Sequence, residues 1–185
     1  MIVDENDWYD SFGEFYMAIA SSSKASALGQ FFTPAPVVNF MVAITGDGTK
    51  GAGERMNDPA SGSGRMLISY HAHYPGNYTF GADIDSICAK MTALNMVIHG
   101  CQGQAVCMNS LNADDWRFGY NINPYIRATG GLPHLVKIEK EQCFQWQYFQ
   151  REKAKFFEKN LQENVEKIIA KTELVAVKFG QLSLF

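Results

Sequence analysis

A short glycine-containing segment and two aspartates stand at a spacing that could build a cofactor site. The segment is Asp58-Pro-Ala-Ser-Gly-Ser-Gly64, and Asp83 follows its last glycine by 19 residues. Glycine lets a backbone turn tightly with positive φ and approach a ligand closely. The aspartate that opens the segment could meet a cationic amine, and Asp83 could accept hydrogen bonds from ribose hydroxyls. Leu67 stands where the dinucleotide fingerprint has its third glycine.

Strands and helices must alternate around this segment to hold it. Strands are predicted at residues 54–58, 78–83 and 104–108, and a helix begins after each of the first two. The second of these helices covers residues 86–99, with Asp85 or Ser86 as its cap. This alternation predicts an α/β fold with a doubly wound, parallel sheet.

Helical periodicity flanks the predicted sheet on both sides. An amphipathic helix is expected within residues 6–20, and Pro36 suits the start of another. Residues 138–173 are predicted to be helical, with room for one break, before an apolar tail at residues 174–185. These patterns predict an N-terminal lead-in, a cofactor-binding core and a helical extension, at residues 1–30, 31–135 and 136–185.

Five blocks occur in order along the chain. They are Phe31-Phe-Thr-Pro34, Asp58-Pro-Ala-Ser-Gly-Ser-Gly64, Gly81-Ala-Asp-Ile-Asp85, Asn95-Met96 with His99-Gly100, and Asn109-Ser-Leu111. Over roughly residues 8–115 they resemble the N6-adenine DNA methylase family, most closely the modification subunits of type I restriction systems. The resemblance implies a truncated, Rossmann-like methyltransferase fold that uses S-adenosylmethionine. It also implies methyl transfer to the exocyclic amino group of a flipped adenine in DNA.

The resemblance assigns roles to individual residues. Asp58 would face the amino group of the cofactor, Asp83 would hold its ribose, and Ile84 would pack against its adenine. Asn109 would bond the adenine amino group; relatives usually have aspartate there, and an asparagine oxygen can also accept this bond. The first block would cover the methionine end, above the glycine turn. The implied cofactor-binding residues are Phe31, Thr33, Pro34, Asp58, Pro59, Gly62, Gly64, Asp83, Ile84, Asn109 and Leu111.

A catalytic motif is expected after the fourth strand of such a fold. The family has Asn/Asp-Pro-Pro-Tyr/Phe there, which accepts the amino hydrogens of adenine and stacks on the flipped base. This chain offers Asn123, Pro124 and Tyr125, 14 residues after Asn109 and with one proline fewer. The buried apolar strand expected before the motif is missing. Two interpretations therefore stay open, a degenerate catalytic motif and a simple turn.

The last five residues resemble the sliding-clamp-binding motif of bacterial replication and repair proteins. Three apolar anchors and a glutamine make up the motif: Gln181, Leu182, Ser183, Leu184 and Phe185. Such a tether would raise the local concentration near DNA without a basic surface. The alternative is an apolar tail that packs back on the domain or forms an edge strand.

The charge and length bear on partners and activity. The net charge of −3 argues against tight DNA binding by the chain alone, since DNA-binding domains normally have a basic surface. Few residues follow the motif at Asn123, so either the fold is pared down or a completing subunit supplies the rest. A catalytically silent adaptor that binds the sliding clamp is the alternative to an enzyme. The four cysteines have no zinc spacing, and His71 with His73 has no suitable third metal ligand. The absence of a signal peptide and of any membrane-spanning apolar run predicts a cytoplasmic protein.

Overall fold

The computed structural model describes residues 7–19, 32–46, 51–126 and 128–182. The chain divides into two compact units, residues 1–146 and 147–185. Within the described residues, no helix has the length and apolar character needed to cross a membrane.

The first unit is built on a mixed five-stranded sheet. Its strands, in both chain order and spatial order, are β1 (Arg55–Asp58), β2 (Tyr78–Asp83), β3 (Gln102–Asn109), β4 (Asn112–Ile122) and β5 (Leu135–Ile138). β1, β2 and β3 pair in parallel, as the alternation of strands and helices predicted, whereas β4 and β5 join antiparallel. The α/β fold class is confirmed, but the prediction of a wholly parallel sheet is wrong beyond β3. A tight hairpin at residues 109–112 reverses the chain there without a helix.

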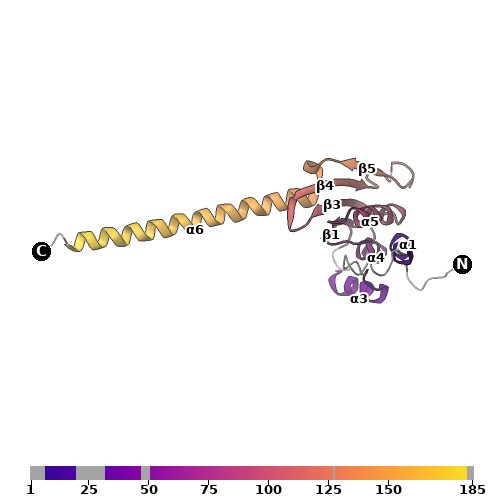
Figure 1. Ribbon diagram of the computed structural model, residues 1–185, viewed down its shortest axis with the longest axis horizontal. Helices are drawn as coiled ribbons and strands as arrows, with labels where there is room; N and C mark the ends of the chain where they lie inside the picture. Colours follow the sequence, from indigo (N-terminus) through magenta and orange to yellow (C-terminus); the bar gives the residue numbers. More distant parts are fainter. Residues whose placement is uncertain (1–6, 20–31, 47–50, 127, 183–185) are drawn as a thin grey trace. The chain divides into compact units, whose positions relative to one another are not determined.

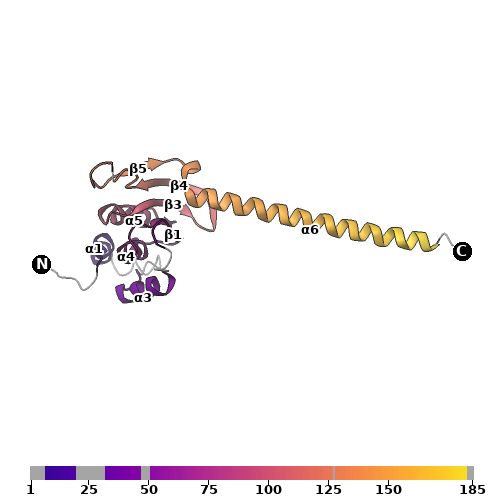
Figure 2. The same ribbon diagram turned by 180° about the vertical axis from the view of Figure 1, so that it is seen from behind.

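Within the described residues, four helices accompany the sheet. They are α1 (Ser11–Ile19), α3 (Ala35–Thr45), α4 (Arg65–His73) and α5 (Ser86–Ile98). α4 packs on β1 and β2, α5 packs on β2 and β3, and α1 contacts α5. Figures 1 and 2 show α3 beyond β1, on the side away from β5, and α3 contacts α4. The predicted helices and strands up to residue 109 are thus confirmed, with shifted ends.

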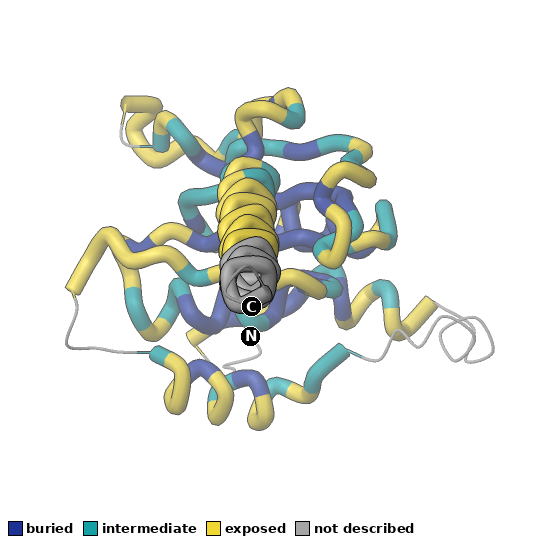
Figure 3. The backbone as a smooth tube through the Cα atoms, turned by 90° about the vertical axis from the view of Figure 1, so that its left-hand side faces the viewer, coloured by how far each residue is buried: buried dark blue, intermediate teal, exposed yellow. Residues whose placement is uncertain are grey.

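Apolar side chains between these helices and the sheet form the core. Leu67, Ile68, Met96 and Val42 are fully buried in it, and Trp8 before α1 is 5% exposed. Figure 3 shows the buried backbone gathered in the middle of this unit, with exposed segments around it. Residues just before α1 therefore belong to the same core as the sheet.

The C-terminal part is helical, as expected, although two elements were missed. β5 and the short helix η1 (Lys140–Gln142) precede α6 (Phe144–Leu182). The first turn of α6 still belongs to the first unit, where the Phe144 ring centroid lies 4.5 Å from that of Phe80. The apolar tail predicted from residue 174 continues the helix to Leu182.

All four cysteines are free and buried, as their spacing suggested. Burial raises the pKa of Cys88 and that of Cys101 to about 12, which leaves both thiols protonated and unreactive.

Candidate cofactor site

The glycine segment forms a tight turn between β1 and α4. Gly62 and Gly64 have φ values of +56° and +91°, and Gly64 is the N-cap of α4. The Ser61 N–H donates to the Ala82 carbonyl at 2.9 Å, which ties the turn to β2. A Cβ on Gly64 would lie 3.2 Å from the Cα of Thr92 on α5. Glycine is required there both by its φ and by the close approach of this helix.

The two predicted carboxylates meet at this turn. Asp58 ends β1, and its side chain accepts from the Ala60 N–H at 3.1 Å. Asp83 ends β2, and its two oxygens accept from the N–H groups of Gly62 and Asp85, each at 2.8 Å. The structure thus brings together residues 25 positions apart at the carboxyl edge of the parallel strands, where open α/β sheets bind ligands.

Burial shifts the protonation of both acids. Desolvation raises the pKa of Asp58, the Ala60 N–H lowers it, and the negative charge of Asp83 raises it again. Desolvation also raises the pKa of Asp83, against the N–H groups of Asp85 and Gly62. Two partly buried carboxylates close to one another are suited to a positively charged ligand.

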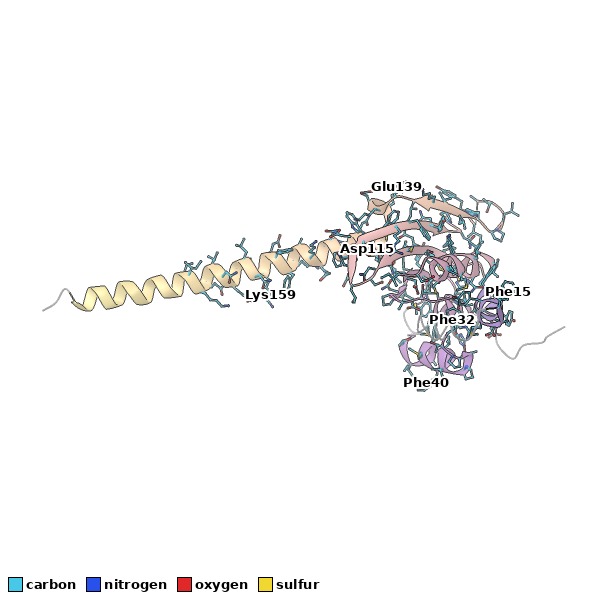
Figure 4. All side chains as sticks on the ribbon, viewed as in Figure 1. Phe15, Phe32, Phe40, Asp115, Glu139 and Lys159 are labelled. Carbon is cyan, nitrogen blue, oxygen red and sulfur yellow. The ribbon has the colours of Figure 1, made fainter. Side chains whose placement is uncertain are left out.

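The first sequence block lies above the turn. A Cβ on Gly62 would be 3.1 Å from the Phe32 ring, so this ring covers the glycine. Figure 4 shows Phe32 between α1, which carries Phe15, and α3, which carries Phe40. Pro34 is the N-cap of α3, and the Thr33 carbonyl accepts from Arg65 at 3.0 Å. Phe31, the aromatic residue predicted to cover the site, lies outside the described residues, and Phe32 is the covering ring that sequence reasoning missed.

The remaining predicted residues border the same edge. Ile84 follows Asp83 and is 54% exposed. Asn109 ends β3, and the hairpin beyond it reaches the turn, because the Ser110 hydroxyl donates to the Pro59 carbonyl at 2.6 Å. Leu111 is 92% exposed at the hairpin tip. An exposed apolar rim and a polar floor therefore surround the turn.

Polar residues of α5 support the turn from below. The Thr92 hydroxyl donates to the Gly62 carbonyl at 2.9 Å and shares a hydrogen bond with the Ser61 hydroxyl at 3.0 Å. The Asn95 amide donates to the Ser63 carbonyl at 2.8 Å. Asn95 stood in a sequence block without an assigned role, and Thr92 stood in no block. A polar residue on the buried face of a predicted helix is the signal that could have identified both.

The structure does not bring Asn123, Pro124 and Tyr125 to this site. Ile122 pairs with Gly103, at the amino end of β3, whereas Asp83 pairs with Cys107 near its carboxyl end. Gly103 and Cys107 are four residues apart in β3, so at roughly 3.3 Å per residue the two positions are separated by about 13 Å along the strand. β4 runs antiparallel and carries the motif back to the opposite end of the sheet. The catalytic interpretation therefore has no support in the geometry, and the turn interpretation agrees with it.

Asn123 has a structural role in that turn. Its side chain is fully buried, with φ at +49°. Its amide donates to the carbonyls of Val97 and Cys101, and its oxygen accepts from the His134 N–H. The exposed ring of Tyr125 stacks on His134, with centroids 5.9 Å apart. Asn123 thus ties the β4–β5 connection to the end of α5 and the segment before β3, and Tyr125 packs within the connection itself.

Replacing Asn123 with alanine should lower the stability of the fold. The variant molecules that still fold should bind a ligand at the glycine turn as tightly as the wild type does. Three side-chain hydrogen bonds to backbone groups would be lost, at an expected cost of about 2–4 kcal/mol in the free energy of unfolding. Urea denaturation measures the loss, and Asn121→Ala, which removes one side-chain bond to Gln104, is the milder control. If the variant kept its stability but no longer bound a ligand at the glycine turn, Asn123 would belong to the functional site, as the catalytic interpretation requires.

The C-terminal motif is only partly within the described residues. Gln181 and Leu182 belong to the backbone of α6, whereas Ser183, Leu184 and Phe185 lie outside the described residues. The clamp-binding interpretation stays a prediction. Within the described residues, no group of three or more potential ligands is placed to hold a metal ion.

Comparisons with known proteins agree with this site. The N-6 DNA Methylase family matches residues 6–129, which include the glycine turn and both aspartates. The type I restriction enzyme MjaVII methylase subunit of Methanocaldococcus jannaschii is 31% identical over 103 residues, which cover 52% of this chain and 17% of that subunit. The type II methyltransferase M.XamI of Xanthomonas campestris pv. amaranthicola is 29% identical over 85 residues, which cover 46% of this chain and 16% of that enzyme.

A solved structure is also similar over part of the chain. The type I restriction-modification methyltransferase subunit from Streptococcus thermophilus has a TM-score of 0.36 and 28% identity, and the match covers 39% of this chain and 16% of that subunit. The chain thus spans about a sixth of the length of the relatives that it matches. Since the family match covers most of the sequence, the chain belongs to the N-6 DNA methylase family.

Proposed function

We propose that this chain binds S-adenosylmethionine at the carboxyl edge of β1–β3 and forms the cofactor half of an adenine-N6 DNA methyltransferase. The carrying observation is the meeting of Asp58 and Asp83 at the Gly62 turn, under the Phe32 ring. Two carboxylates with raised pKa values suit a cofactor that bears a positive sulfonium and an amino group. The glycine turn provides the close backbone approach.

Each residue around the turn takes a part in this binding. Asp58 would pair with the amino group of the cofactor, and Asp83 would accept from its ribose hydroxyls. The exposed side chain of Ile84 would pack against its adenine. Asn109 would accept from the adenine amino group. Phe32 would cover the methionine end together with Thr33 and Pro34.

Bound S-adenosylmethionine would supply an electrophilic methyl group, and the acceptor would be the exocyclic amino group of a flipped adenine. Within the described residues, the site edge holds no asparagine–proline–aromatic motif to bind such an amino group. Methyl transfer therefore calls for acceptor-binding residues from a completing polypeptide.

The unpaired edge of β1 supports the proposal that a second polypeptide supplies the acceptor-binding residues. Among the described strands β1 pairs with β2 alone, and its residues Arg55 and Asn57 are exposed. A strand edge with unpaired N–H and C=O groups is a ready template for pairing with a strand of another chain. A cavity of about 480 Å³ runs beside β1, between it and α3, and Met41, Met56 and Met66 contribute to its lining. A strand supplied by the completing subunit would pair with β1 there and bring its own residues beside Asp58.

A catalytically silent adaptor is the second candidate. It is favoured by the position of Asn123, far from the cofactor edge, because a chain without acceptor-binding residues could still bind the cofactor. A tritiated-methyl transfer assay on unmethylated DNA separates the two candidates. Transfer that appears when the completing subunit is added supports the enzyme, and intact cofactor binding without transfer supports the adaptor.

Calorimetric titration with S-adenosylmethionine and S-adenosylhomocysteine tests the binding proposal. We expect micromolar to millimolar binding that strengthens as the pH rises from acidic values. The sign follows from the raised pKa values, since Asp58 and Asp83 must be ionised to bind a cation. Affinity should level off once both are charged, and Asp58→Asn should weaken this pH dependence. No heat of binding at millimolar ligand would refute the proposal.

The C-terminal pentapeptide predicts an interaction with the bacterial sliding clamp. We expect the full chain, but not one ending at residue 180, to be retained on immobilised clamp. Three apolar side chains would anchor in a hydrophobic pocket, with Gln181 at its rim. A chain with Leu184 and Phe185 replaced by serine is the matched control for length. Equal retention of all three chains would exclude this tether.

A further inference from the structure

A buried ion pair joins the N-terminal segment to the start of α4. Asp10 and Arg65 are 2% and 6% exposed, and the Arg65 Nε donates to Asp10 at 2.5 Å. The other guanidinium nitrogens donate to the Glu14 carboxylate on α1 and to the Thr33 carbonyl. A single side chain thus holds three segments that are far apart in sequence.

Asp10 is fully satisfied by its surroundings. One oxygen accepts from the Gly13 N–H at 2.8 Å and from the Asn95 amide at 2.6 Å. The other accepts from the Ser63 hydroxyl as well as from Arg65. Both Ser63 and Arg65 flank Gly64, so this network reaches directly into the glycine turn.

Arg65 also contacts the ring that covers the turn. Its guanidinium carbon lies 5.6 Å from the Phe32 ring centroid, and Tyr16 of α1 lies 5.9 Å from the same ring. The carbonyl that Arg65 binds belongs to Thr33, the next residue. Arg65 therefore holds the backbone and the ring of residues 32–33 at once.

A buried ion-pair network of this kind adds little to the stability of a fold. Burying two charges costs about as much as their attraction returns, and well-packed apolar residues often stabilise a core equally well. A bidentate or tridentate arginine instead fixes geometry, because its planar fork accepts partners only in set directions.

We propose that Arg65 is a positioning residue for the cofactor. Through the Thr33 carbonyl and the Phe32 ring it fixes the segment that closes the methionine end of the site over Gly62. This inference rests on the proposed function, and it adds a residue to which the sequence assigned no role. It predicts that a variant without the Arg65 guanidinium binds the methionine end of the cofactor more weakly and still binds the ribose and adenine.

Two ligands distinguish a residue that positions the methionine end of the cofactor from one that only stabilises the fold. S-adenosylhomocysteine has the amino-acid end, whereas 5′-methylthioadenosine lacks it and retains the ribose and adenine. We expect Arg65→Lys to weaken S-adenosylhomocysteine about 10-fold, because a lysine that pairs with Asp10 cannot also hold the Thr33 carbonyl. The dissociation constant of 5′-methylthioadenosine should stay within about twofold of the wild-type value. Equal losses for both ligands, or no loss for either, would overturn the proposal.

A second variant keeps the test decisive if Arg65→Lys does not fold. Phe32→Ala leaves the ion pair intact and should produce the same ligand-selective loss. Equal losses of both ligands in Phe32→Ala would overturn the proposal. Where Arg65→Lys does fold, its loss and that of Phe32→Ala should not add in the double variant, since Arg65 acts through the segment that carries Phe32. Full additivity would overturn the proposal. Failure of the wild-type chain to bind either ligand would instead refute the proposed function, together with this inference.

Discussion

Replacing Asp83 with asparagine should weaken S-adenosylmethionine binding about 10- to 100-fold. The carboxylate accepts from two backbone N–H groups at 2.8 Å and would accept further hydrogen bonds from the ligand. An asparagine keeps one acceptor oxygen and turns an NH₂ group toward a donor, so either the turn or the ligand loses a partner. Isothermal titration calorimetry of the folded variant measures the change.

Asp85→Asn is the matched control for this substitution. It removes the same charge two residues away, and asparagine is as good an N-cap for α5 as the aspartate that accepts from Ile87 and Cys88. We expect its ligand affinity to stay within about threefold of wild type. Similar losses in both variants would mean that net charge, and not the contact made by Asp83, governs binding.

Replacing Gly103 with alanine should unfold the first unit. Gly103 lies in β3 with φ at +151°, and an added Cβ would come within 1.8 Å of the Thr79 carbonyl oxygen in β2. The clash is with backbone, so no side-chain rotation relieves it and the two strands must separate. The expected loss is about 4 kcal/mol or more in the free energy of unfolding, a large part of the stability of a typical domain. Circular dichroism during thermal denaturation detects it.

Gly53→Ala controls for backbone conformation alone. Gly53 also has positive φ, at +97°, but nothing lies within 4 Å of a Cβ built there. Its loss should be limited to the strain of about 1–2 kcal/mol that an L-residue meets at positive φ. If both alanine variants lost the same stability, the close contact between β2 and β3 would not be the reason.

The parallel half of the sheet, β1 to β3, could be predicted from the sequence because strands and helices alternate there. β1, α4, β2, α5 and β3 alternate in the way that parallel sheets require, and Asp85 caps α5 as proposed. β4 was missed because it is antiparallel and partly exposed, so polar residues interrupt its apolar ones. An apolar buried strand was expected there, and its absence was taken as the absence of any strand.

The part of the site that could be predicted consists of residues at the carboxyl ends of neighbouring parallel strands. Asp58 and Asp83 each follow a parallel strand, so their meeting follows from topology. The two interpretations of Asn123 could not be separated from the sequence, because the distance in sequence does not reveal the direction of the strand that leads to it. Arg65 escaped notice because its partners stand 32 to 55 positions earlier in the chain, and no local pattern marks such pairs.

The strand order β1-β2-β3-β4-β5 has a consequence for synthesis on the ribosome. Each strand that emerges finds its only earlier neighbour already made, so the sheet can grow one strand at a time without waiting for distant sequence. Such vectorial growth favours folding during translation. The growing edge moves steadily away from β1, and the first strand made is left accessible to whatever joins it later.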